Sequence, residues 1–200
     1  MHYLDFYHHF QKFASFSAAD IRRAEPAFNL RQLNYWMSGG LLQKICRGHY
    51  RFTDRALNET ILLTIANRLY EPSYISLETA LSHHGLIPES VYNQTSVTSR
   101  KTQTLKTPLG SFIYRHLSPR LFFGYTLGAG FKLAEPEKAV LDYLYLNPLM
   151  RQPSDFYEWR LNPEVFKELI NLDKLESYLR KFNSHATTAR VRRQLKYLKL

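Results

Sequence analysis

A chain of 200 residues with 44% hydrophobic residues is long enough for one medium domain, or for a small domain joined to a larger one. The formal net charge of +10 favours a polyanionic partner such as nucleic acid. Because the chain has no run of about twenty apolar residues and no basic start followed by an apolar run, we expect a cytoplasmic protein without a membrane span.

Apolar periodicity predicts most of the helices. Phe6, Phe10 and Phe13, for example, recur at the spacing of one helix face. The predicted helices, besides two short ones described next, span residues 3–13, 58–70, 77–84, 136–147, 163–170, 173–182 and 187–199. Segments 91–99, 111–117 and 121–127 are rich in β-branched and aromatic residues, which predicts strands. The expected fold class is α+β, in which an N-terminal unit precedes a larger mixed α/β domain with a small antiparallel sheet and C-terminal helices.

Two short helices are predicted between residues 17 and 38. Ser17 is a capping residue with Asp20 at the third helical position, which is the pattern of a capping box. Pro26 disfavours helical geometry at the residue before it and ends this helix. Asn29 and Gln32 repeat the capping pattern after a four-residue turn. Two capped helices joined in this way predict a helix-turn-helix.

The second of these helices carries side chains that read base edges. Leu30 and Leu33 fall on the inner face of the helix, so the polar residues point outward. Arginine bonds guanine, and asparagine or glutamine bonds adenine, in the major groove. The residues expected to contact bases are Arg31, Gln32, Asn34, Tyr35 and Ser38.

A β-hairpin is predicted directly after this helix. Gly39 and Gly40 end the helix, residues 41–45 and 49–53 form two strands, and Arg47 and Gly48 form the turn between them. The hairpin side chains expected to contact the DNA backbone are Lys44, Arg47, His49 and Arg51. Residues 1–56 are therefore predicted to form a winged helix-turn-helix DNA-binding domain, and residues 57–200 the second domain. Two copies would bind an inverted-repeat operator, each on a half-site of about ten base pairs.

Six phrases of the sequence, taken together, resemble one family. They are LNYWMSGGLL (33–42), RGHY (47–50), YISLETALSHHGLIP (74–88), TPLG (107–110), FFGY (122–125) and AEPEKAVLD (134–142). In this order they are similar to AbiEi-type antitoxins of type IV toxin–antitoxin and phage-defence systems, over residues 15–147. The resemblance implies a repressor of its own operon, whose C-terminal domain neutralises a nucleotidyltransferase-like toxin.

The remaining clusters of polar residues are interpreted as structural. Pro136 suits the first turn of a helix, where Glu135 and Glu137 complement the helix dipole, and Lys138 lies one turn from Asp142. The histidine pairs at 8–9 and 83–84 lack zinc-ligand spacing. The Gly-Ser pair at 110–111 has no following Asp-x-Asp, and a lone cysteine excludes an internal disulfide. We therefore expect no catalytic site, no metal and no cofactor.

The last predicted helix is basic and amphipathic, with Val191, Leu195 and Leu198 on its apolar face. Its cations are expected to form an auxiliary basic face made of Arg190, Arg192, Arg193, Lys196 and Lys199. This face is compatible with a solvated helix end, with auxiliary phosphate contacts, or with docking of an acidic partner.

Two other functions remain open. One is a protein-interaction module that binds a toxin directly, without operator-specific DNA binding, since a winged fold alone does not prove DNA binding. The other is a nucleic-acid-processing enzyme that uses Glu137 and Asp142.

Overall fold

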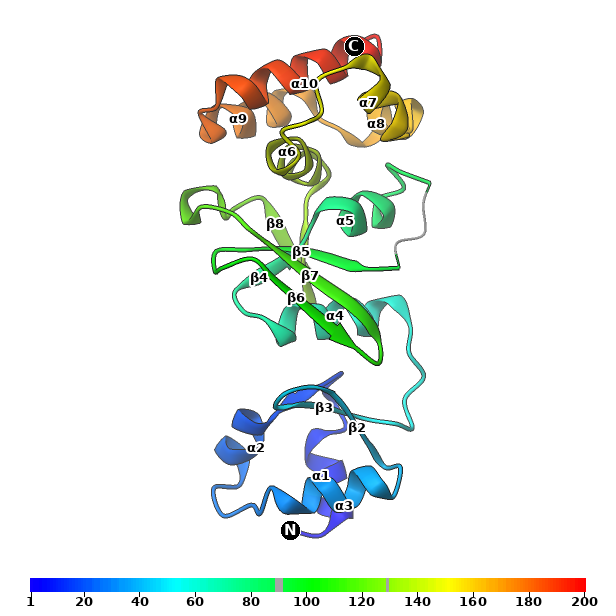
Figure 1. The fold of residues 1–200 in the computed structure, drawn as a ribbon, viewed down its shortest axis with the longest axis vertical. Helices are drawn as coiled ribbons and strands as arrows, with labels where there is room; N and C mark the ends of the chain where they lie inside the picture. Colours follow the sequence, from blue (N-terminus) through cyan, green and yellow to red (C-terminus); the bar gives the residue numbers. More distant parts are fainter. Residues whose placement is uncertain (89–91, 129) are drawn as a thin grey trace.

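The N-terminal unit combines three helices with a three-stranded antiparallel sheet (Figure 1). The computed structural model describes residues 1–88, 92–128 and 130–200. The elements of this unit are α1 (Tyr3–Phe10), β1 (Phe16–Ser17), α2 (Ala18–Ala24), α3 (Arg31–Ser38), β2 (Leu42–Cys46) and β3 (His49–Phe52). The sheet has the order β1-β3-β2. The three helices and the hairpin follow one another in the predicted order, whereas the short strand β1 between α1 and α2 was not predicted.

An aromatic core holds the N-terminal unit together. The fully buried ring of Phe6 lies 4.8 Å from that of Trp36 and 5.4 Å from that of Phe16, between ring centroids. These three side chains come from α1, α3 and β1, so the core joins helices to the sheet. Full burial of an aromatic side chain of this kind contributes about 1.5–3 kcal/mol.

Local signals explain where α2 and α3 begin and end. The predicted capping box is confirmed, since Ser17 Oγ accepts from the backbone N–H of Asp20 at 3.0 Å and the Asp20 carboxylate accepts from Ser17. The second box is not formed, because the Asn29 side chain accepts from the backbone N–H of Arg31 instead. Helix α3 therefore begins at Arg31, and the turn from α2 is longer than the four residues expected.

A six-stranded sheet forms the centre of the molecule. Its strands are β4 (Ser73–Ile75), β5 (Gln94–Thr98), β6 (Gln103–Thr107), β7 (Gly110–His116), β8 (Tyr125–Gly128) and β9 (Phe131–Ala134). They lie in the order β6-β7-β5-β4-β9-β8. The sheet is mixed, since β5 pairs with β7, and β4 with β9, in parallel, which corrects the expectation of a small antiparallel sheet in this region. Residue 91 of the predicted strand 91–99 lies outside the described residues.

Helices cover both faces of this sheet. Helix α4 (Glu59–Leu69) lies on the side that faces the N-terminal unit, whereas α5 (Leu77–His83) and α6 (Pro136–Leu146) lie on the other side (Figure 1). A 3-10 turn, η1, spans Pro119–Leu121. Beyond α6 lie the C-terminal helices α7 (Pro153–Glu158), α8 (Pro163–Leu169), α9 (Leu172–Phe182) and α10 (His185–Tyr197). No helix among the described residues has the length and apolar character needed to cross a bilayer.

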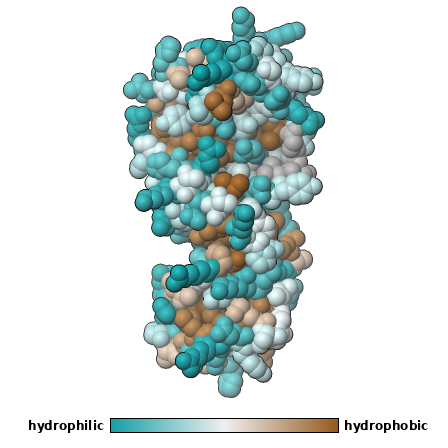
Figure 2. Space-filling view, in the orientation of Figure 1, coloured by the Kyte–Doolittle hydropathy of each residue, from teal (hydrophilic) through white to brown (hydrophobic). Residues whose placement is uncertain are grey.

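The N-terminal unit contacts the central sheet through its hairpin. Ile45 of β2 is buried in the core of the central sheet and not in the aromatic core of its own unit. The Arg68 guanidinium of α4 donates to the Asp20 carboxylate of α2 at 2.9 Å. Although burial opposes it, hydrogen bonds from Ser17 and the charge of Arg68 lower the pKa of Asp20. Figure 2 shows a narrow waist at this junction, with hydrophobic side chains among the hydrophilic ones.

A buried polar cluster lies beneath α6. The Lys138 ammonium pairs with the Asp142 carboxylate one turn later, and both side chains are fully buried. Asp142 also accepts from the hydroxyl groups of Tyr74 at 2.7 Å and of Ser76 at 2.9 Å. Burial lowers the pKa of Lys138 and raises that of Asp142. The sequence spacing of one helical turn is thus realised as a buried ion pair in the core.

Gly124 permits the close approach of the chain to this cluster. Its φ of +71° favours glycine, and an added Cβ would lie 3.0 Å from a ring carbon of Tyr178 and 3.1 Å from Lys138 Cγ. We expect Gly124→Ala to lower the free energy of unfolding by about 1–3 kcal/mol, measured by urea denaturation. Gly128→Ala is the matched control, since its φ is ordinary and no described atom lies within 4 Å of the added Cβ. Equal stability of the two variants would contradict this account.

Candidate nucleic-acid interface

One face of α3 is exposed and polar along its whole length. Arg31, Asn34, Tyr35 and Ser38 follow the spacing i, i+3, i+4, i+7, which places them on one side of a helix. All four side chains are exposed, and Tyr35 retains 77% of its accessible surface. The opposite face holds Leu33 and Trp36 in the aromatic core. Four of the five residues predicted to contact bases are therefore brought together by the helix.

Gln32 differs from the other four predicted base readers. It lies beside the stripe and not on it, and its side chain is half-buried. Its predicted role as the third position of a capping box is also not realised. Gln32 is therefore a weaker contact candidate than Arg31 or Asn34.

Nothing in the described part of the chain covers the α3 stripe. Arg31 and Asn34 have no side-chain partner there, and the Ser38 hydroxyl donates to the backbone carbonyl of Tyr35 in its own helix at 2.8 Å. Figure 1 shows α3 at the end of the N-terminal unit that points away from the central sheet. The stripe is thus free to enter a groove of an elongated ligand such as a duplex.

The hairpin offers fewer cations than the sequence predicts. Lys44 and Arg47 are exposed, and Arg47 lies in the β2–β3 turn next to Gly48. Arg51 is a correction, because only 6% of its surface is exposed and its guanidinium donates to the backbone carbonyls of Phe52 and Arg55, at 2.9 and 2.7 Å. Arg51 therefore fixes the chain after β3 and does not present its charge to a ligand.

His49 is the other hairpin residue whose environment differs from the expectation. It is half-buried at the pairing of β3 with β1. Burial lowers its pKa, and the Arg68 charge acts in the same direction, whereas Asp20 and Glu71 partly offset the decrease. Burial therefore disfavours the charged form of His49, which makes it a weaker candidate for a cationic phosphate contact than Lys44 or Arg47.

This depressed pKa makes stability depend on pH. The pKa of His49 is lower in the folded chain than the value of about 6.5 in the unfolded chain, so the unfolded chain binds more protons between these two values. The contribution of neutral His49 to stability is therefore complete above about pH 6.5 and is lost as the pH falls through the folded-state pKa. We expect the melting temperature to fall between about pH 7 and pH 5, and to fall less in His49→Gln. His2→Gln, at an exposed position, is the control. An unchanged slope in His49→Gln would contradict this.

One exposed cation of α2 was missed by the sequence analysis. Arg22 is exposed and has no partner among the described residues, whereas its neighbour Arg23 lies 3.7 Å from Asp20. The first helix of a helix-turn-helix crosses the phosphate backbone. That rule, applied to the predicted helix before Pro26, could have identified Arg22.

The predicted basic face on α10 divides into three parts. Arg190 is a second correction, because only 7% of its surface is exposed and its Nε donates to the Leu144 carbonyl at 2.7 Å. Arg192 pairs with Glu176 of α9 at 3.1 Å. Arg193, Lys196 and Lys199 remain exposed. Figure 1 shows α10 at the opposite end of the molecule from α3.

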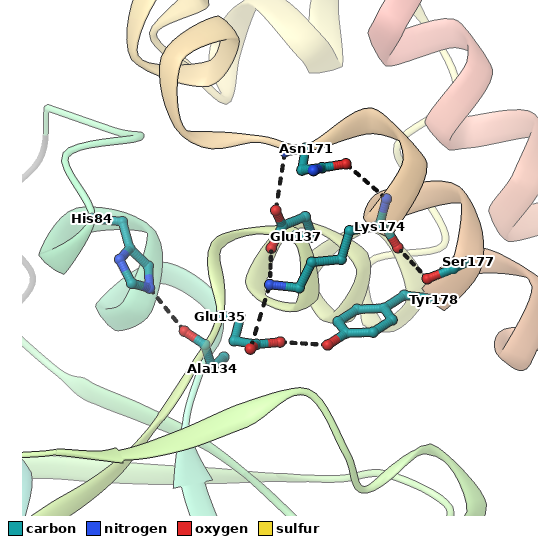
Figure 3. A network of polar contacts seen from close by, with 8 residues as sticks. All are labelled: His84, Ala134, Glu135, Glu137, Asn171, Lys174, Ser177 and Tyr178. Carbon is teal, nitrogen blue, oxygen red and sulfur yellow. Dashed lines mark hydrogen bonds and ion pairs between the residues drawn. The ribbon is translucent and has the colours of Figure 1, made fainter.

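The carboxylates at the start of α6 connect it to α9. Figure 3 shows Lys174 between Glu135 and Glu137, at 3.4 and 3.2 Å from the nearest carboxylate oxygens. The Tyr178 hydroxyl donates to Glu135 at 2.5 Å, and the backbone N–H of Asn171 donates to Glu137 at 3.0 Å. Burial, and to a lesser degree the hydrogen bond to Glu135, raise the pKa of Tyr178 to about 12. These contacts give the carboxylates a structural role.

Two other polar side chains, His84 and Asp142, also have structural partners. His84 Nε2 donates to the Ala134 carbonyl at 2.8 Å, which ties α5 to the strand before α6 (Figure 3). Asp142, the second carboxylate of the rival enzyme hypothesis, is fully buried with three protein donors. In the described ranges, no group of three or more histidine, cysteine, aspartate or glutamate side chains is placed to hold a metal ion.

The chain matches no protein-family model and no curated protein. The resemblance to AbiEi-type antitoxins therefore stays a prediction from the sequence phrases.

Proposed function

We propose that the protein is a sequence-specific DNA-binding regulator of transcription, and that residues 1–56 form a winged helix-turn-helix. The observation that carries the proposal is the exposed stripe of Arg31, Asn34, Tyr35 and Ser38 on α3. A helix of this kind fits the major groove, where arginine reads guanine and asparagine reads adenine. The stripe is exposed, and α3 lies at the end of the molecule away from the central sheet, which supports access of a duplex to it (Figure 1).

Contacts to the DNA backbone complete the proposed interface. Lys44 and Arg47 of the hairpin and Arg22 of α2 are exposed cations of the same unit. They position the protein on the duplex through phosphates and carry no sequence information. Since Ile45 on β2 is covered by the central sheet, the hairpin contributes only its exposed side chains and turn. Two copies on an inverted repeat would each occupy about one helical turn of DNA.

The sequence resemblance supplies the biological setting of the proposal. It supports an operator upstream of the protein's own gene, autoregulation in the cytoplasm, and toxin neutralisation by residues 57–200. Co-expression of a neighbouring nucleotidyltransferase-like gene tests the last point separately. Rescue of growth by this chain would support the antitoxin role, and unrelieved toxicity would remove it without affecting DNA binding.

An electrophoretic mobility shift with the DNA upstream of its own gene tests the regulator. Scrambled DNA of equal length and composition is the competitor, at near-physiological salt, since non-specific binding depends steeply on salt. We expect selective retention of the upstream fragment. Equal retention of both fragments, or of neither, together with capture of a neighbouring gene product, would favour the toxin-binding module instead.

A further inference from the structure

A recess between α7 and α10 combines three cations with an apolar floor. Its volume is about 340 Å³, and it is lined by Arg151, Pro153, Phe156, Arg193, Lys196 and Tyr197. Phe156 is 2% exposed and forms the buried part of the lining, whereas Tyr197 is 42% exposed. This volume lies at the lower end of the range of about 300–1,000 Å³ that is typical of ligand pockets.

The cations of this recess have no carboxylate partner in the described ranges. The Arg193 guanidinium donates to the backbone carbonyl of Arg151 at 3.3 Å, and Arg151 Nε donates to that of Pro148 at 3.3 Å. The nearby Asp155 carboxylate accepts from backbone N–H groups of residues 151 and 152. Exposed cations elsewhere in this region do find partners, as Arg192 does with Glu176. The recess therefore holds a concentrated positive charge.

The charges of two recess residues, Arg151 and Arg193, also act on the buried Arg190 of α10. Burial lowers its pKa, and the charges of Arg151 and Arg193 lower it further. Like charges held together in this way repel one another, and an anion bound among them relieves the repulsion. The arrangement favours an anionic ligand over an empty state.

We propose that the recess between α7 and α10 binds an acidic peptide segment of a protein partner, with carboxylates on Arg151, Arg193 and Lys196 and an apolar side chain on Phe156. Arginine guanidinium groups pair with carboxylates in bidentate geometry, and the apolar side chain of the peptide would pack against the apolar floor of the recess. A duplex supplies anions but no apolar group to fill the floor. This site also lies at the opposite end of the molecule from α3, so it does not depend on the DNA-binding proposal.

Fluorescence anisotropy of the full chain with labelled peptides tests the proposal. The probe is a short peptide of alternating glutamate and leucine, and its comparisons carry glutamine for glutamate or serine for leucine. We expect binding of the probe only, weakened by added salt because the contacts are ionic. Arg193→Glu should weaken it at least about tenfold, as loss of a charge-assisted bond does. Lys167→Glu, an equal charge change on α8 away from the recess, should leave it within about twofold.

Circular dichroism of both variants establishes that each is folded. Equal weakening by Arg193→Glu and Lys167→Glu would overturn the proposal, because the attraction would then be general. Absence of probe binding would overturn it as well. If a single-stranded or duplex oligonucleotide bound more tightly than the peptide probe, and this binding depended on Arg193, the proposal would be overturned and the ligand of the recess would be nucleic acid.

Discussion

Asp142→Asn is expected to lower the free energy of unfolding by about 3–5 kcal/mol, because it leaves the Lys138 charge buried without its counter-ion. Both side chains have no exposed surface, and the substitution keeps the size of the side chain. The Lys138 ammonium would keep the Tyr74 hydroxyl, at 2.8 Å, and a neutral amide oxygen as polar partners, but no counter-ion. Urea denaturation followed by circular dichroism measures the change.

An exposed ion pair is the control for this prediction. Arg192 and Glu176 lie 3.1 Å apart with side chains 61% and 40% exposed. Arg192→Met should therefore cost no more than about 1 kcal/mol. If Asp142→Asn lowered the free energy of unfolding by no more than Arg192→Met does, the buried pair would not be important for the stability of the fold.

Arg31→Ala and Asn34→Ala are each expected to weaken operator binding by about 1–3 kcal/mol, or up to about a hundredfold. Each change removes a side chain that has no partner in the described part of the chain, so folding should be unaffected. Binding to scrambled DNA should change little for Asn34→Ala, since base contacts add specificity above the phosphate contacts. Titration of both DNAs by anisotropy measures the two effects.

Arg47→Ala is the contrasting variant, since it removes an exposed hairpin cation. It should weaken binding to operator DNA and to scrambled DNA alike. The slope of log K against log salt concentration should fall by about one, as expected for the loss of one phosphate contact. If Arg47→Ala relaxed sequence preference and Asn34→Ala did not, the assignment of α3 as the reading helix would be wrong.

Most helices were predicted from the sequence because their signals are local, although α7 was not predicted and the capping box at Asn29 did not form. The segments 58–70, 136–147 and 173–182 coincide with α4, α6 and α9 within one residue at each end. The Ser17 capping box depends on residues three apart and is also realised. Strands β4, β6 and β9 were missed, because each is at most five residues long and its existence depends on distant pairing partners.

The errors at the site have a similar origin. Arg51 was expected to contact the DNA backbone from the hairpin, but the backbone carbonyls of Phe52 and Arg55 accept hydrogen bonds from its guanidinium. Arg190 is likewise drawn inward by the Leu144 carbonyl of α6, which is distant in sequence. Long cationic side chains can reach buried acceptors even where the sequence pattern predicts an exposed position. The α3 stripe was predictable, since burial of Leu33 and Trp36 orients the whole helix.

Site-specific photo-crosslinking tests most directly whether α3 lies on DNA. Tyr35 of α3 and Tyr197 of α10 are exposed, and these two helices lie at opposite ends of the molecule (Figure 1). Each tyrosine can be replaced by p-benzoylphenylalanine in the full chain. Illumination with operator DNA should give a covalent complex from position 35 and none from position 197. A crosslink from position 197 alone, or none from position 35 while the DNA is bound, would contradict the account.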